Sequence, residues 1–176
     1  MLLELLYFDY RPLVQEVLST CLIVLAFIWG GGPERAVAAT WLVAFELLGL
    51  IDRFVTGPGA TLTDVDSFLA FKDLTAGALW IFIALYANRN YTLWIAGLQI
   101  IAMAAHLVRG VVESISPISY AVMYIGPGWF QLFLLAAGLS RHIMRKRKYG
   151  PYRDWRLVRL APEDRILGRF QRRLIS

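Results

Sequence analysis

Five long apolar segments, separated by short polar or glycine-rich links, make up most of the chain. A helix rises about 1.5 Å per residue, so roughly 20 apolar residues cross the ~30 Å hydrocarbon layer of a bilayer. The pattern therefore predicts an all-α polytopic membrane protein, with a bundle of about five transmembrane helices in residues 1–140 and a tail in residues 141–176. The predicted spans are residues 12–30, 36–53, 66–87, 92–110 and 117–140.

Glycine and proline mark the ends of several spans. Gly30-Gly31-Gly32-Pro33 closes the first span, and Asn88-Arg89-Asn90 forms a tight turn between the third and the fourth. Inside the fifth span, Gly126-Pro127-Gly128 predicts a break or a kink in the helix, because proline cannot donate the helical hydrogen bond. Such a site either packs against neighbouring helices or opens a pocket for a lipid or another ligand.

The composition agrees with a membrane protein and excludes several soluble classes. Of the 176 residues, 58% are apolar and 18% are charged, which is incompatible with a disordered chain or a disulfide scaffold. The single cysteine, Cys21, lies inside the first span and is expected to be a small buried packing residue. The first residues lack a basic stretch and a cleavage pattern, so we expect the first apolar segment to be kept as a span.

The charges are distributed unequally along the chain. Residues 1–140 carry a net charge of −4, whereas residues 141–176 carry +9. Because basic residues are retained on the cytoplasmic side, this asymmetry predicts a cytoplasmic C-terminus, and an odd number of spans then places the N-terminus on the opposite side.

The basic tail is a candidate docking element. Residues 162–176 place apolar side chains on one helical stripe, which predicts an amphipathic helix on the membrane surface. We expect the basic residues to bind anionic lipid headgroups or an acidic surface of another membrane subunit, and not nucleic acid, for which the chain has no motif. They are Arg141, Arg145, Lys146, Arg147, Lys148, Arg165, Arg169, Arg172 and Arg173.

Polar residues within the predicted spans are candidates for function, because ionisable side chains are costly in a membrane. They are Glu46, Lys72, Asp73, Gln99, His106 and Arg109. With the orientation above, the charged residues gather in the outer half of the membrane, and the inner half is expected to be nearly free of charge. We expect an interhelical network in which Lys72 pairs with Glu46 or an aspartate. Asp73 is expected to pair with Arg109 or His106, and an outward-facing cavity or proton site is the alternative.

Common catalytic and metal-binding motifs are absent from the sequence. There is no phosphate loop, HExxH, CxxC or GxSxG pattern, so no catalytic residue, metal site or cofactor is predicted. The two histidines, His106 and His142, lie at different depths and cannot share one haem iron. His106 as a single axial ligand to haem or chlorophyll is left open.

Two stretches carry a resemblance to known sequences. They are Ala87-Asn88-Arg89-Asn90-Tyr91-Thr92-Leu93-Trp94, followed by Gln99 and His106-Leu107-Val108-Arg109, and the tail pattern Tyr149-Gly150-Pro151-Tyr152-Arg153-Asp154-Trp155-Arg156. Together they resemble small uncharacterised polytopic membrane proteins of alphaproteobacterial type. The resemblance implies a bacterial inner-membrane location and no activity. In that membrane, the orientation predicted from the charges makes the N-terminus periplasmic.

The sequence as a whole favours a non-catalytic accessory or assembly subunit of a larger inner-membrane complex, which acts through helix packing and tail docking. The complex could be an energy-transducing one. Two alternatives remain: a small ion or solute carrier or channel that uses the outer polar residues, and a membrane-embedded lipid-modifying enzyme with its site near Asp66, Asp73, His106 and Arg109.

Overall fold

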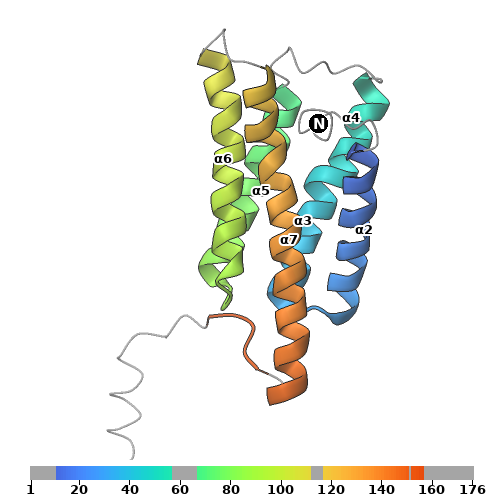
Figure 1. Ribbon diagram of the computed structural model, residues 1–176, viewed down its shortest axis with the longest axis vertical. Helices are drawn as coiled ribbons and strands as arrows, with labels where there is room; N and C mark the ends of the chain where they lie inside the picture. Colours follow the sequence, from blue (N-terminus) through green and yellow to red (C-terminus); the bar gives the residue numbers. More distant parts are fainter. Residues whose placement is uncertain (1–10, 57–66, 112–116, 151, 157–176) are drawn as a thin grey trace, which may run out of the picture.

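The fold is a bundle of long helices (Figure 1). The computed structural model describes residues 11–56, 67–111, 117–150 and 152–156, and the regular secondary structure of these residues is helical, with no strand. The helices are α2 (Arg11–Trp29), the continuous run of α3 (Gly32–Trp41), π-helical η1 (Leu42–Leu47) and α4 (Leu48–Thr56), then α5 (Ser67–Tyr86), α6 (Tyr91–Val111) and α7 (Pro117–Tyr149). Each of the five predicted spans overlaps one of these five helical rods, if α3, η1 and α4 are counted as a single rod.

Two helix ends differ from the prediction. The second rod begins at Gly32 and not near residue 36, because Pro33 in its first turn has a backbone angle already suited to a helix and lacks the N–H that would be unpaired there. The last rod continues past residue 140 to Tyr149, since its Arg, Lys and Met residues favour helix and three cations in the last turn suit the negative end of the helix dipole. It ends before Gly150, whose φ of +75° is readily adopted only by glycine.

The helix α7 also runs through Gly126-Pro127-Gly128, so the chain is not broken there as the sequence allowed. A proline removes a single backbone hydrogen bond, and the turns on both sides keep theirs. Pro127 is buried, and α7 packs against α2, α3 and α6. This packing holds the helix together across the proline.

Aromatic and small side chains build the centre of the bundle. Trp41, Phe45 and Trp80 form one aromatic group, with ring centroids 5.0 to 5.9 Å apart. Trp80 is fully buried, and its indole N–H donates to the Val37 carbonyl at 3.4 Å. Buried alanines on several helices let the backbones approach closely, as in helix packing within membranes. They include Ala26, Ala38, Ala44, Ala76, Ala84, Ala87, Ala96, Ala102 and Ala105.

Large apolar side chains cover the outside of the bundle. Two segments, Phe68–Tyr86 in α5 and Tyr91–Val108 in α6, are long and apolar enough to cross a membrane, and α2 contains the shorter apolar segment Leu13–Trp29. By length and composition alone, two such helices are weak evidence for a polytopic membrane protein. Exposed apolar residues occur on every rod and include Val17, Phe54, Phe82, Trp94, Leu107 and Phe133.

The side chain of Cys21 is exposed, so the prediction of a buried packing residue is wrong. The helix α2 packs against the bundle on one side, through Ser19, Leu22, Ile23 and Ala26. Successive residues of a helix point about 100° apart, which turns Cys21 away from that side.

Candidate functional site

Three segments that are distant in the sequence meet at one end of the bundle. They are the turn from α2 into α3, the turn between α5 and α6, and the chain after α7, residues 152–156, which we call the return segment. After Gly150 the chain turns back toward the bundle (Figure 1). The return segment then lies against the α5–α6 turn, where the Asn88 N–H donates to the Asp154 carbonyl at 3.0 Å and the Arg156 N–H to the Tyr86 carbonyl at 2.7 Å. We call this the tail-side end.

Arg89 connects these segments. Its Nε lies 3.1 Å from Glu34 Oε1, its Nη2 lies 2.7 Å from Asp154 Oδ1, and its Nη1 donates to the Asn88 carbonyl at 3.3 Å. Glu34 has no exposed surface, and Arg89 is buried as well. Burial by itself lowers the pKa of Arg89, but the Glu34 carboxylate and, less strongly, Tyr152 and Asp154 outweigh it and raise the pKa above its ordinary value. The guanidinium therefore stays charged and compensates a carboxylate that could not be buried alone.

His142 reaches the same place from α7. Its Nδ1 lies 2.8 Å from the Tyr152 hydroxyl and 3.3 Å from Arg89 Nη2. Because a guanidinium can only donate, the contact with Arg89 makes Nδ1 an acceptor and leaves the ring proton on Nε2. This Nε2 is buried and has no hydrogen-bond partner among the described residues.

Tyr152 in the return segment lies between two cations. The guanidinium carbons of Arg89 and Arg145 lie 4.6 and 4.4 Å from the centre of its ring, a cation–π arrangement. Burial is the main cause that raises the pKa of the Tyr152 hydroxyl, and the Arg89 charge opposes it. The hydroxyl thus remains protonated and able to donate to His142.

Two glycines allow the return segment to approach α3. A Cβ at Gly31 would lie 2.7 Å from His142 Cε1 and 2.9 Å from Asp154 Oδ1, and a Cβ at Gly32 would overlap the Trp155 indole. The Gly32 N–H donates to Asp154 Oδ2 at 2.9 Å. Asp154 therefore caps the positive end of α3, which is a favourable position for a carboxylate.

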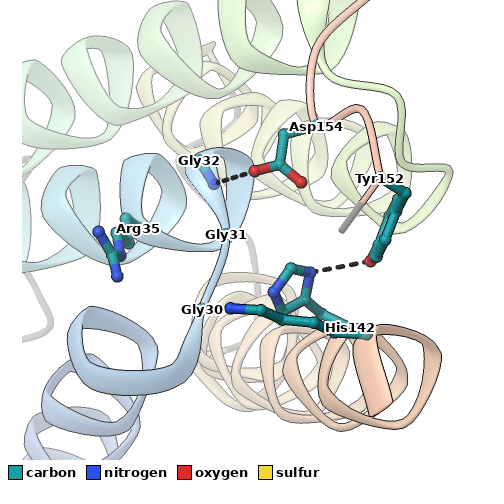
Figure 2. A pocket seen from close by; sticks show the side chains of 8 residues that line it. Gly30, Gly31, Gly32, Arg35, His142, Tyr152 and Asp154 are labelled. Atoms are coloured by element: carbon teal, nitrogen blue, oxygen red, sulfur yellow. Dashed lines mark hydrogen bonds between the residues drawn. The ribbon is translucent and has the colours of Figure 1, made fainter. Parts of the chain in front are cut away.

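A cavity of about 270 Å³ opens beside this cluster. Figure 2 shows His142 and Tyr152 joined by their hydrogen bond on one side of it, Asp154 bonded to the Gly32 N–H, and Arg35 on α3 across from them. Its walls combine backbone from a glycine-rich turn with polar and charged side chains. The lining residues are Gly30, Gly31, Gly32, Arg35, His142, Lys146, Tyr152 and Asp154.

A second buried polar cluster joins α5, α6 and α7. Asp73 Oδ2 lies 2.7 Å from His106 Nε2, and the Gln99 amide donates to Asp73 Oδ1 at 2.8 Å. Gln131 on α7 donates to Gln99 Oε1 at 2.9 Å. Gly77 faces this cluster, since a Cβ there would lie 3.3 Å from Gln99 Cγ. These bonds link helices in a way that suits a water-free interior.

The six polar residues predicted for one intramembrane network are found in different places. Asp73, Gln99 and His106 belong to the cluster just described, and Asp73 pairs with His106, one of its two expected partners. Glu46, in η1, accepts a hydrogen bond from Ser19 on α2. The Lys72 ammonium lies 5.3 Å from the centre of the Phe68 ring. The Arg109 side chain lies outside the described residues.

The basic residues predicted for docking are partly described. Arg141, Arg145, Lys146, Arg147 and Lys148 are exposed on the last turns of α7. Arg141, Arg145 and Lys148 line an open groove of about 700 Å³, together with Met144, Tyr149 and Tyr152. The predicted amphipathic helix, with Arg165, Arg169, Arg172 and Arg173, lies outside the described residues.

The tail-side cluster was missed by reasoning from sequence. Its buried charged residues, Glu34 and Arg89, lie outside the predicted spans, so the expectation that the inner half of the membrane is nearly free of charge stays a prediction. Glu34 was assigned to a link because the second helix starts earlier than predicted. A usable signal existed, since the two stretches that carry the resemblance contain Arg89, Tyr152 and Asp154.

Comparison of the chain with models of protein families, with curated proteins and with solved structures finds no match. In the part of the chain that the structure describes, no group of three or more His, Cys, Asp or Glu side chains is placed to hold a metal ion. The geometry of the described residues is therefore the basis for a functional proposal.

Proposed function

We propose that this protein is a non-catalytic accessory or assembly subunit of a larger inner-membrane complex, and that it docks a neighbouring subunit through its tail-side end. The observation that carries the proposal is the position of Arg89, which ties the return segment to the bundle through Glu34 and Asp154. A tail held by a buried ion pair presents its basic residues as a fixed surface.

The distribution of polar and apolar side chains supports a membrane location. Polar groups such as Asp73, Gln99 and His106 are buried between helices, whereas large apolar side chains are exposed on the outside. This arrangement is opposite to that of a soluble protein, for which so large an exposed apolar surface would be a liability. A hydrocarbon environment around α5, α6 and the other helices would cover this exposed apolar surface.

Charge supports the orientation with the tail-side end at the cytoplasmic face. The exposed cations of α7 lie in its last turns, next to the return segment with Arg153 and Arg156. Anionic headgroups at the cytoplasmic surface attract such residues by about 1 kcal/mol each. The same surface attracts an acidic patch on a partner, and the groove between Arg141, Arg145 and Lys148 is wide enough to receive its side chains.

The test is purification of the full chain from its native membrane in mild detergent, followed by native gel separation and mass spectrometry of the co-migrating chains. The proposal predicts a band larger than the 20.0 kDa monomer, with partner chains in fixed ratio. The variant Arg141→Glu/Arg145→Glu/Lys148→Glu should lose these partners, and the matched variant Arg141→Lys/Arg145→Lys should keep them. A wild-type chain that runs alone would overturn the proposal.

One observation favours a second candidate, a proton-coupled carrier. Asp73 and His106 form a buried pair of titratable groups inside the bundle, the kind of pair that relays protons in membrane proteins. In this case Asp73→Asn would abolish a proton-dependent flux in liposomes that contain the purified protein, whereas Thr75→Val, two residues from Asp73 on the same helix, would not.

A further inference from the structure

We infer that the cavity at the tail-side end binds a phosphate group, either that of an anionic phospholipid headgroup or a free phosphate ion, through His142 Nε2, Arg35 and Lys146. This inference does not need a partner subunit. Its lipid form rests on the membrane location in the proposed function, and its free-phosphate form does not.

The first support is the unpartnered donor of His142. The side chain is 5% exposed, it lines the cavity, and its Nδ1 is occupied by the Tyr152 hydroxyl and Arg89. The proton is thereby directed to Nε2, which has no partner among the described residues. A buried N–H without an acceptor is costly, and an oxygen atom in the cavity would satisfy it.

The second support is the charge of the cavity. Arg35 and Lys146 line it from α3 and α7, and both side chains are exposed enough to close over a ligand. Asp154 also lines the cavity, but its carboxylate is held by Arg89 and by the Gly32 N–H. Arg89, Glu34 and Asp154 together carry one negative charge. With the two positive charges of Arg35 and Lys146, the net charge of the site is therefore +1, which attracts a phosphate anion.

The third support is the backbone around the cavity. Gly30, Gly31 and Gly32 lead directly into α3, whose N-terminal end carries partial positive charge. The lack of a Cβ at Gly31 and Gly32 leaves room for His142, Asp154 and Trp155 to pack against this backbone at the wall of the cavity. The helix end alone would not define a site, because Asp154 already takes the Gly32 N–H. The unpartnered His142 donor distinguishes this cavity from an ordinary capped helix.

A phospholipid fits the surroundings of the cavity. Its volume of about 270 Å³ admits a headgroup phosphate, whereas acyl chains must lie outside it. Ile28 and Trp29, in the last turn of α2 beside Gly30, are exposed and provide an apolar surface for such chains. With the tail-side end at a membrane surface, the cavity lies at the level of the headgroups.

The experiment uses the full chain purified without partners in an uncharged detergent. Calorimetric titration with inorganic phosphate at constant ionic strength measures the free ion, and native mass spectrometry after addition of phosphatidylglycerol or uncharged diacylglycerol measures the lipid. We expect Lys146→Gln and Arg35→Gln each to weaken binding about tenfold, as expected for loss of one charge-assisted hydrogen bond. The matched control is Arg147→Gln, which removes an exposed charge from the same turn outside the cavity.

Each outcome bears on the inference. Retention of phosphatidylglycerol but not diacylglycerol, lost in Lys146→Gln and kept in Arg147→Gln, supports the lipid form, and the same pattern in the phosphate titration supports the free ion. The variant His142→Phe should also lose binding, while thermal unfolding reports whether it folds. No binding of either probe, or equal loss in Lys146→Gln and Arg147→Gln, overturns the inference. The partner measurement on native membranes is separate, so either proposal can fail without the other.

Discussion

Arg89 and Asp154 are 65 positions apart in the sequence, and their side chains meet with Nη2 2.7 Å from Oδ1. The contact ties the chain after the last helix to the turn between α5 and α6. Because Arg89 also holds the fully buried Glu34, the same guanidinium joins three separate parts of the chain. Arg89 therefore stabilises the tail-side end, together with the backbone hydrogen bonds of the return segment.

Replacing Arg89 should be strongly destabilising. We expect Arg89→Met to lower the free energy of unfolding by about 3–5 kcal/mol, because it leaves the Glu34 carboxylate buried without a counter-ion. The double variant Arg89→Met/Glu34→Gln should recover part of this loss, since the uncompensated charge is gone. Denaturant unfolding in detergent micelles measures both. The exposed Arg153→Met is the control, and an equal effect of all three variants would contradict the prediction.

Removing the Asp154 carboxylate should release the return segment. We expect trypsin to cleave after Arg153 and Arg156 about tenfold faster in Asp154→Ala, because the contacts to Arg89 and to the Gly32 N–H are lost. Asp154→Asn keeps an acceptor for Gly32 and should give an intermediate rate. Timed proteolysis with mass spectrometry gives these rates. Unchanged cleavage in Asp154→Ala would mean that other contacts hold the segment.

Substitution of glycine should have opposite effects at two positions. Gly32→Ala places a Cβ against the Trp155 indole and should cost about 1–3 kcal/mol. Gly97→Ala, within α6, meets nothing within 4 Å and should stabilise by up to about 1 kcal/mol, through the better helix propensity of alanine. Thermal unfolding of the two variants in the same detergent compares them. A stabilising Gly32→Ala would show that the return segment does not pack there.

Asp73 should stabilise the interior through its hydrogen bonds. We expect Asp73→Leu to lower the free energy of unfolding by about 1–3 kcal/mol, because Gln99 and His106 lose their acceptor in a buried place. Thr75→Val is the matched control, since among the described residues the Thr75 hydroxyl bonds within its own helix, to the Phe71 carbonyl. Unfolding in mixed micelles measures the difference. Equal stability of the two variants would show that the hydrogen bonds of Asp73 do not stabilise the fold.

The Tyr152 hydroxyl predicts a pH dependence at the alkaline end. Its pKa in the folded chain is raised above the ordinary value of 10.0, mainly by burial. The folded protein then holds this proton more tightly than the unfolded chain, so its contribution to stability is complete below pH 10 and is lost as the pH rises through the folded pKa. Unfolding measured from pH 8 upward should show this loss in the wild type and a smaller one in Tyr152→Phe. Identical curves would refute it.

The helices themselves were predictable because their signal is local. An apolar run of about 20 residues needs only its own backbone hydrogen bonds and an apolar environment, so each predicted span appears as one helix or, for the second span, as the continuous run α3–η1–α4. The predicted bounds were wrong at some helix ends, because a few local residues decide where a helix begins or stops. Pro33 started α3 earlier than its apolar pattern indicated, and the basic residues after Ser140 extended α7 although they are not apolar.

The amino-acid sequence by itself determined the number of rods, their approximate bounds and the concentration of positive charge after residue 140, because each depends on neighbouring residues. Only the tertiary structure decided which polar residues meet. Glu34 lies in the first turn of α3, Arg89 in the α5–α6 turn and Asp154 in the return segment, so no local pattern relates them. Their contact depends on how the helices are packed and where the chain turns back at Gly150, and burial of Glu34 is tolerated only because that packing supplies Arg89.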